Sequence, residues 1–189
     1  MEEVEHVCPV WVGYFLASPL RKLFQSPRKI TGSYIKKGMT IIDAGCAMGF
    51  FSLPMAGMTG ENGRVICIDV QEKMLQQLMK RADKHGLGEI IIPHKAEPTS
   101  LNIPDLNEGA DFALAFAVVH EVPDKITFFS ELHKALKAGG KLLVAEPSGH
   151  VSKQAFSKTM EIAQDKGFRV LEKPKIHNSI SALLEKSVS

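Results

Sequence analysis

Short apolar runs alternate along the chain with longer segments in which apolar residues recur every three or four positions. Short apolar runs predict buried β-strands, and the three-to-four spacing predicts helices with one apolar face. Because the two kinds of segment alternate, the sequence predicts an α/β fold with a parallel sheet that helices cover on both faces. Strands are expected at residues 40–43, 65–69, 90–93, 112–116, 142–146, 168–172 and 180–185.

Three helical segments are expected between these strands. They should end at Gly86, Gly139 and Gly167, because glycine readily adopts the left-handed conformation that terminates a helix. Asp124 is expected to cap the start of the second segment. The apolar faces consist of Met74, Leu75, Leu78, Met79 and Ala82 in the first segment, Phe128, Phe129, Leu132, Ala135 and Leu136 in the second, and Phe156, Met160 and Ala163 in the third.

The length and composition are those of a single domain with its own core. The chain has 189 residues, of which 44% are hydrophobic, and a formal net charge of +2. A chain of this size can bury a sufficient core without disulfides or metals. No basic stripe interleaved with aromatic residues is present, so a nucleic-acid partner is not expected.

The cysteines and the N-terminal residues bear on location. An odd number of cysteines without C-x-x-C spacing is typical of a reducing compartment, and Cys46 and Cys67 are interpreted as packing residues. His6 and Cys8 lack further ligands nearby, so no metal site is predicted. The N-terminus is acidic and the apolar stretch 9–20 is too short to cross a bilayer. We therefore expect a cytoplasmic protein without a membrane partner.

A glycine-rich turn follows the first strand and carries the strongest functional signal. The strand ends in Asp43, and Gly45, Ala47 and Gly49 follow at alternate positions. Such a turn lets a ligand approach the backbone, and free N–H groups at the next helix attract a negative group. Asp69 closes the second strand 20 residues beyond Gly49, where a ribose-binding acid falls in a nucleotide-binding βαβ unit. The turn is therefore expected to bind a nucleoside.

The spacing of this turn differs from that of a dinucleotide-binding turn. Its third small position is occupied by the bulky Phe50, which weakens an NAD interpretation. The pattern Asp43-x-Gly45-x-Ala47-x-Gly49 resembles instead the D/E-x-G-x-G-x-G signature of class I S-adenosylmethionine-dependent methyltransferases, with alanine in place of the middle glycine. An acid can attract the ammonium of S-adenosylmethionine, and the turn can bind its carboxylate.

The resemblance extends over nearly the whole chain, through segments 96–97, 116–124 and 136–141. It implies a Rossmann-like three-layer sandwich whose mostly parallel, seven-stranded sheet ends in an antiparallel C-terminal hairpin strand. Many members place an aspartate before the alanine of the third strand to bind adenine. This chain has Lys95 there, and Glu97 is taken as the substitute. The cofactor-binding residues implied by the resemblance are Asp43, Gly45, Cys46, Ala47, Gly49, Asp69, Val70, Ala96, Glu97 and Phe116.

The resemblance places His120 and Glu121 close to the methyl donor. A neutral imidazole can accept a proton from an oxygen or nitrogen nucleophile, although His120 could equally pack against the cofactor or cap the next helix. The aromatic segment 8–16 could close the pocket as a lid, with Tyr14 orienting a polar substrate group, or simply pack across the sheet. His120, Glu121 and Tyr14 are thus the candidate catalytic residues.

Together these features predict an N-terminal arm or lid at 1–30 and a single S-adenosylmethionine-binding domain at 31–189. The expected function is methyl transfer to a small-molecule acceptor, because little chain is left to recognise a macromolecule. The general pattern resembles quinone-biosynthesis and arsenite-type methyltransferases, without the clustered cysteines expected for arsenite. A non-catalytic S-adenosylmethionine-binding sensor or subunit, and a nucleotide-dependent oxidoreductase, stay open as alternatives. The acceptor and the oligomeric state are left undefined by the sequence.

Overall fold

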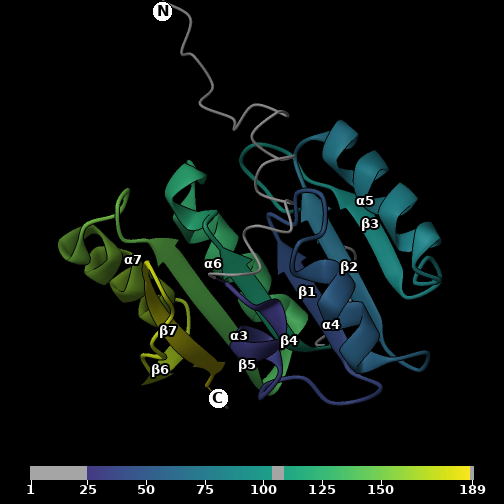
Figure 1. Cartoon of the computed structure of the whole chain (residues 1–189). Helices are drawn as coiled ribbons and strands as arrows, with labels where there is room; N and C mark the ends of the chain where they lie inside the picture. Colours follow the sequence, from purple (N-terminus) through teal and green to yellow (C-terminus); the bar gives the residue numbers. More distant parts are fainter. Residues whose placement is uncertain (1–24, 104–108, 188–189) are drawn as a thin grey trace, which may run out of the picture.

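Seven strands form one sheet in the computed structural model, which describes residues 25–103 and 109–187 (Figure 1). The spatial order is β3-β2-β1-β4-β5-β7-β6. Strands β1 to β5 run parallel, and β7 pairs antiparallel with both β5 and β6. The strands are β1 (Thr40–Ala44), β2 (Arg64–Asp69), β3 (Ile91–Lys95), β4 (Ala110–Phe116), β5 (Leu136–Pro147), β6 (Phe168–Glu172) and β7 (Ser179–Lys186).

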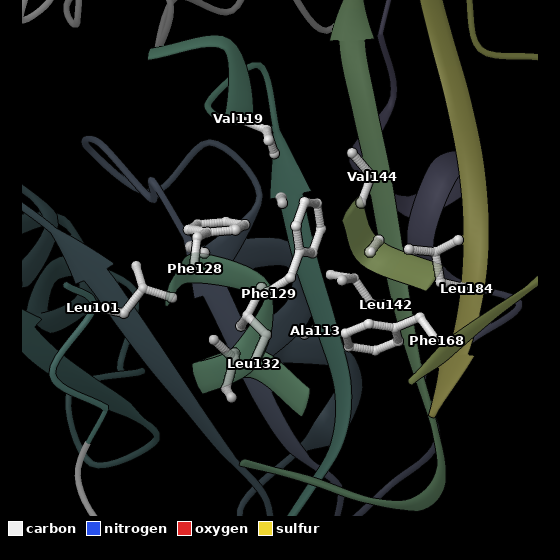
Figure 2. Packing of buried hydrophobic residues seen from close by; sticks show 14 of the residues in the cluster. Leu101, Ala113, Val119, Phe128, Phe129, Leu132, Leu142, Val144, Phe168 and Leu184 are labelled. Atoms are coloured by element: carbon white, nitrogen blue, oxygen red, sulfur yellow. The ribbon is translucent and has the colours of Figure 1, made fainter. Parts of the chain in front are cut away.

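Helices cover both faces of this sheet. Side chains of α4 and α5 belong to one buried apolar cluster, and side chains of α6 and α7 belong to the other. In Figure 2, Phe128, Phe129 and Leu132 of α6 pack against residues of β4 and β5. The described helices are α3 (Pro27–Thr31), α4 (Ser52–Thr59), α5 (Glu72–Lys84), the short 3-10 helix η1 (Val119–Glu121), α6 (Lys125–Ala135) and α7 (Lys153–Asp165).

The expected fold class is confirmed. Strand β1 is buried at all five positions because helices cover both of its faces, which explains why the adjacent residues Ile41 and Ile42 are both apolar. Helix α5 buries four of the five residues of its predicted apolar face, Met74, Leu75, Leu78 and Ala82, and the fifth, Met79, is partly buried against the same core. The antiparallel hairpin is formed by β6 and β7, as the resemblance implied.

Most helix ends also agree with the sequence, with one exception. The carboxylate of Asp124 caps α6 by accepting a hydrogen bond from the Thr127 N–H at 3.0 Å. Gly86 and Gly167 follow the ends of α5 and α7 with positive φ angles of 66° and 90°. The prediction for Gly139 was wrong: α6 ends at Ala135, and Gly139 lies inside β5. The register between β4 and β5 shifts in this region, and Gly139, with a φ of 74°, lies in the irregular first part of β5.

Three further expectations concern the cysteines, the N-terminal segment and a membrane span. Cys46 and Cys67 are buried free thiols, as expected for packing residues. Segment 1–24, with Cys8 and Tyr14, lies outside the described residues, so the lid and the domain division at residue 30 stay predictions. Among the helices that the structure describes, none is long and apolar enough to span a membrane.

Candidate active site

A pocket opens beyond the carboxyl ends of β1, β2 and β4, where the strand order of the sheet reverses at β1. Ligands of open α/β sheets bind at this point, because loops from neighbouring strands diverge there. The lining includes Asp43, Gly45, Cys46, Ala47, Met48, Phe50, Phe51, Ile68, Asp69, Val70, Gln71, Met74, Ala96, Glu97, Pro98, Thr99, Ser100, Leu101, Phe116, Ala117, Val118, Glu121, Val122 and Phe128. Of the ten residues that the resemblance assigned to the cofactor, all except Gly49 lie in this wall.

The glycine turn, residues 45–49, is shaped by two positions that exclude a side chain. Gly45 has a φ of 76°, and an added Cβ would lie 2.5 Å from Cγ2 of Val118. Gly49 has a φ of 80°, and its Cβ would lie 2.2 Å from Cδ1 of Leu78. Gly45 therefore lets the turn approach the loop after β4, whereas Gly49 lets α5 pack behind the turn. This position explains why Gly49 does not line the pocket.

Asp69 connects the turn after β1 to the turn after β2. Its Oδ2 accepts a hydrogen bond from the Ala47 N–H at 2.9 Å, and its Oδ1 accepts one from the Gln71 N–H at 2.9 Å. Burial raises the pKa of Asp69, while these two N–H donors lower it. Each oxygen has a further lone pair for a ligand hydroxyl. Asp69 thus both shapes the glycine turn and presents acceptors to the pocket.

Asp43 is a buried acid at the end of β1, with 3% of its surface exposed. The Ser52 hydroxyl donates a hydrogen bond of 2.5 Å to its Oδ2. Burial raises the pKa of Asp43 to about 7, with a smaller raising effect from the negative charge of Asp69 and a lowering effect from Ser52. A cationic ligand group would stabilise the charged carboxylate at this position.

The segment after β3 forms the next part of the wall. The Ala96 N–H donates to the Asp69 carbonyl oxygen at 3.0 Å, which brings Ala96 and Glu97 to the pocket. Lys95 pairs with Asp69 in the sheet but does not line the pocket. Glu131 of α6 holds the end of this segment, because its two oxygens accept from the Ser100 hydroxyl and the Leu101 N–H, both at 2.6 Å. Glu131 was not predicted from the sequence, because its partners lie about 30 residues away along the chain.

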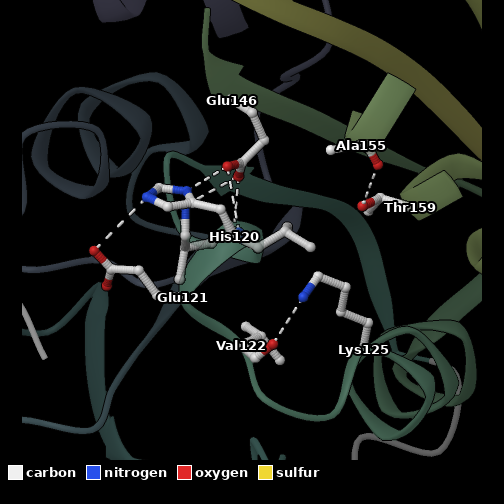
Figure 3. Close-up of polar contacts among 9 residues, drawn as sticks. His120, Glu121, Val122, Lys125, Glu146, Ala155 and Thr159 are labelled. Carbon is white, nitrogen blue, oxygen red and sulfur yellow. Dashed lines mark hydrogen bonds and ion pairs between the residues drawn. The ribbon is translucent and has the colours of Figure 1, made fainter. Parts of the chain in front are cut away.

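In the segment after β4, the adjacent candidates His120 and Glu121 differ in their position relative to the pocket. Glu121 lines the pocket, whereas His120 does not. Nδ1 of His120 contacts Oε2 of Glu146, and its Nε2 lies 3.8 Å from Oε1 of Glu121 (Figure 3). Glu146 was expected only as the end of a strand, because nothing in its local sequence indicates partners 26 to 28 residues earlier.

The sequence matches a known family across most of this architecture. Residues 35–183, which carry all seven strands and the pocket, match the family described as "Methyltransferase domain". The chain belongs to this methyltransferase family. Its seven-stranded sheet and glycine turn are those of the class I S-adenosylmethionine-dependent methyltransferases.

Individual relatives agree with this family membership. A solved structure of an S-adenosylmethionine-dependent methyltransferase from Aquifex aeolicus superposes with a TM-score of 0.84 at 24% identity, covering 95% of this chain and 100% of that one, which shows a shared fold. The demethylmenaquinone methyltransferase of Oceanobacillus iheyensis is 25% identical over 114 residues, 60% of this chain and 47% of that protein. The biotin biosynthesis bifunctional protein BioHC of Teredinibacter turnerae is 30% identical over 107 residues, 54% of this chain and 18% of that protein. The chain thus spans about half the length, or less, of these curated relatives.

The pocket of this methyltransferase fits S-adenosylmethionine, the cofactor of the family. Two carboxylates, the buried Asp43 and the partly buried Asp69, have raised pKa values and face one pocket, which suits a ligand that carries an ammonium and a sulfonium. A Cβ at Gly45 would clash with Val118, so only glycine lets the turn lie this close to the loop after β4 that lines the same pocket. No cluster of three potential metal ligands is present among residues 25–103 and 109–187.

Proposed function

We propose that this methyltransferase transfers the methyl group of S-adenosylmethionine to a small-molecule acceptor. The observation that carries the proposal is the placement of Asp43 and Asp69 in one pocket beside the glycine turn. Acids whose pKa values are raised gain from a cationic ligand, which stabilises their charged forms. A dinucleotide would instead bring its negative pyrophosphate to the glycine turn, close to these two acids.

The roles of the residues follow from their positions. Asp43 attracts the cofactor's ammonium, directly or through water, and Asp69 accepts from the ribose hydroxyls while it holds the Ala47 N–H. Glu97 is the acceptor for the adenine amino group, since it lines the pocket on the segment after β3. The neighbouring small residues Ala96 and Ala47 leave room for the ligand.

The chain itself contributes mainly placement to the chemistry. When bound, S-adenosylmethionine supplies a methyl group that is already activated by its sulfonium. The protein must therefore hold the acceptor's nucleophile in line, at about 3–3.5 Å from the methyl carbon, and exclude water. The side chains of Val118, Val122 and Phe128 form an apolar wall for this purpose beside the carboxylate of Glu121.

The small-molecule class of acceptor is supported by the relatives' names, which refer to demethylmenaquinone and to biotin biosynthesis. The net charge of +2 offers no electrostatic basis for a nucleic-acid acceptor.

A cytoplasmic location is also proposed, and the free thiols Cys46 and Cys67 support a reducing compartment.

Calorimetric titration of the full chain with S-adenosylmethionine, S-adenosylhomocysteine and NAD tests the cofactor. We expect micromolar binding of the first two and no binding of NAD. Binding of NAD alone would overturn the proposal in favour of an oxidoreductase. Formation of S-adenosylhomocysteine with a panel of small acceptors then tests turnover, and cofactor binding without turnover of any acceptor would indicate a sensor or subunit.

A further inference from the structure

We propose that Glu146, His120 and Glu121 form a proton relay that removes the proton of a hydroxyl acceptor at the pocket wall. This inference rests on the proposed function, because the relay has a role only if a methyl acceptor binds beside Glu121. It names the class of acceptor, an apolar molecule that reacts through a hydroxyl group such as a phenol.

Glu146 is the fixed end of the relay. It lies near the end of β5 with 2% of its surface exposed. Its Oε1 accepts from the backbone N–H groups of Val118 at 3.2 Å and Val119 at 2.9 Å, and its Oε2 accepts from the His120 N–H at 3.3 Å. Three backbone donors hold this carboxylate in one orientation, against the imidazole.

His120 is the middle member of the relay. Its Nδ1 contacts Oε2 of Glu146, so the carboxylate accepts and Nδ1 carries the proton. Nε2 is thereby the nitrogen that titrates, and it faces Glu121 (Figure 3). The hydrogen bond to Glu146 raises the pKa of His120; burial and the charge of Lys125 lower it, and the charges of Glu146 and Glu121 raise it. This arrangement makes the imidazole a proton acceptor that becomes a stabilised imidazolium.

Glu121 is the member that reaches the pocket. Its side chain is 40% exposed and lines the pocket wall. Burial raises the pKa of Glu121, the charge of His120 lowers it, Glu146 and Asp69 raise it, and His150 lowers it. A carboxylate with a raised pKa is a better base than a free one. Because its neighbours in the wall include Val118, Val122 and Phe128, the acceptor beside it is expected to be apolar around its hydroxyl.

The relay accounts for the proton that the acceptor loses during methyl transfer. The acceptor oxygen gives its proton to the Glu121 carboxylate and receives the methyl group, while the C–S bond breaks and the sulfonium becomes a neutral thioether. The proton then passes to Nε2 of His120, where the imidazolium lies between two carboxylates. The 3.8 Å between Nε2 and Oε1 closes by rotation of the partly exposed Glu121 side chain. An acceptor that is already ionised, such as a thiolate, needs no relay.

Histidine titration followed by nitrogen NMR tests the geometry without any acceptor. We use the full chain labelled at histidine, bound to S-adenosylhomocysteine, and assign the His120 signal with His120→Asn. Nδ1 of His120 should be protonated at every pH, and Nε2 should titrate above the ordinary pKa. Glu121→Gln should lower this pKa and Glu146→Gln should lower it further, whereas Glu161→Gln, a change at an exposed glutamate of α7, should not. Protonation at Nε2 in the neutral form, or a pKa that Glu121→Gln leaves unchanged, would overturn the relay.

Transfer of labelled methyl to phenol and to thiophenol tests the acceptor class. The two probes have the same shape, but thiophenol is largely ionised at neutral pH. Glu121→Gln and His120→Asn should slow transfer to phenol by about 100-fold or more and transfer to thiophenolate by about 3-fold at most. His85→Asn, at an exposed residue after α5, should change neither rate. Equal losses for the two probes would overturn the role as a base, and the histidine titration decides if neither probe is methylated.

Failure of the relay can be told from failure of the proposed function. Calorimetry on the same variants reports cofactor binding separately. If the wild-type chain does not bind S-adenosylmethionine, the proposed function fails. If it binds normally and the His120 titration does not respond to Glu121, only the relay fails.

Discussion

The carboxylate of Asp69, at the end of β2, accepts a hydrogen bond of 2.9 Å from the backbone N–H of Ala47 in the glycine turn. Ala47 has a φ of 45°, a left-handed conformation that is uncommon for alanine. The bond therefore helps to hold the turn in the shape that surrounds the pocket. One acid that resembles a ribose-binding residue therefore also shapes the glycine turn beside it.

Replacing Asp69 by alanine should consequently weaken binding through two losses. The ribose hydroxyls lose an acceptor, and the Ala47 N–H loses its partner. We expect the Kd for S-adenosylmethionine to rise roughly 5- to 150-fold, which corresponds to about 1–3 kcal/mol. Calorimetry measures the change, and Asp165→Asn at the exposed end of α7 is the control. An unchanged Kd would refute the role of Asp69.

Gly45 can be tested against a glycine that shares its backbone conformation but not its surroundings. Gly45 and Gly86 have φ angles of 76° and 66°, but a Cβ meets Val118 only at Gly45 and open space at Gly86. Gly86→Ala should cost about 1–2 kcal/mol of unfolding free energy, the cost of a left-handed alanine. Gly45→Ala should cost more and should also weaken cofactor binding. Denaturant unfolding and calorimetry measure both, and equal effects of the two substitutions would show that Val118 does not confine the turn.

The sheet and the cofactor side of the pocket were predictable because they depend on local patterns. Strand β1 and the glycine turn are adjacent in sequence, and the parallel sheet brings Asp43 and Asp69 to the same edge. Gly139 was misjudged because a glycine with positive φ ends a helix or bends a strand equally well. Here β5 begins directly after Ala135, so Gly139 lies within a strand and not at the end of a helix.

The contacts that hold the pocket wall from outside were less predictable. They join segments that are distant in sequence, such as Glu146 with His120 and Glu131 with Ser100. Neither glutamate belongs to a recognisable motif, and each is identified only by the partner that folding brings to it. Even the neighbours His120 and Glu121 could not be separated from sequence, since their different orientations arise from the short helix η1.

Asp43 should make stability depend on pH in a defined direction. Its folded-state pKa of about 7 lies above the unfolded value of 3.8, so the folded state binds the proton more tightly. The unfolding free energy should therefore fall as the pH rises from about 4 to about 7 and level off above. Asp43→Asn removes this contribution. The unfolding free energy of the variant minus that of the wild type should therefore rise over the same pH window. Denaturant unfolding at several pH values measures it, and a constant difference would contradict the raised pKa.

The same acid should couple cofactor binding to proton release. A cation beside Asp43 lowers its pKa, so near neutral pH the carboxyl group should lose part of a proton when S-adenosylmethionine binds. Calorimetry in buffers that differ in ionisation enthalpy counts the protons released. Asp43→Asn should reduce the count without abolishing it, because the pKa of Asp69 is also raised. Proton uptake by the wild type would contradict the assignment of the cationic groups to this end of the pocket.

Glu131 should influence cofactor affinity from outside the pocket. Its carboxylate holds Ser100 and Leu101, both of which line the wall, through hydrogen bonds of 2.6 Å. Glutamine keeps one acceptor oxygen and has an NH2 donor in place of the other, so Glu131→Gln can accept from only one of these groups and holds the segment less tightly. We expect the Kd for S-adenosylmethionine to rise roughly 3- to 10-fold, near the net value of about 1 kcal/mol for one hydrogen bond.

Hydrogen exchange separates this effect from a general loss of stability. The Leu101 amide should exchange faster in Glu131→Gln, whereas the amides of β1 and β4, which pair within the centre of the sheet, should not. Ser100→Ala removes the hydroxyl bonds to Glu131 and Asn102 but leaves the bond between the Leu101 N–H and Glu131, and it should raise the Kd less than Glu131→Gln does. If the Leu101 amide is unaffected while the Kd rises, the segment after β3 is held by other contacts and Glu131 acts through the packing of α6.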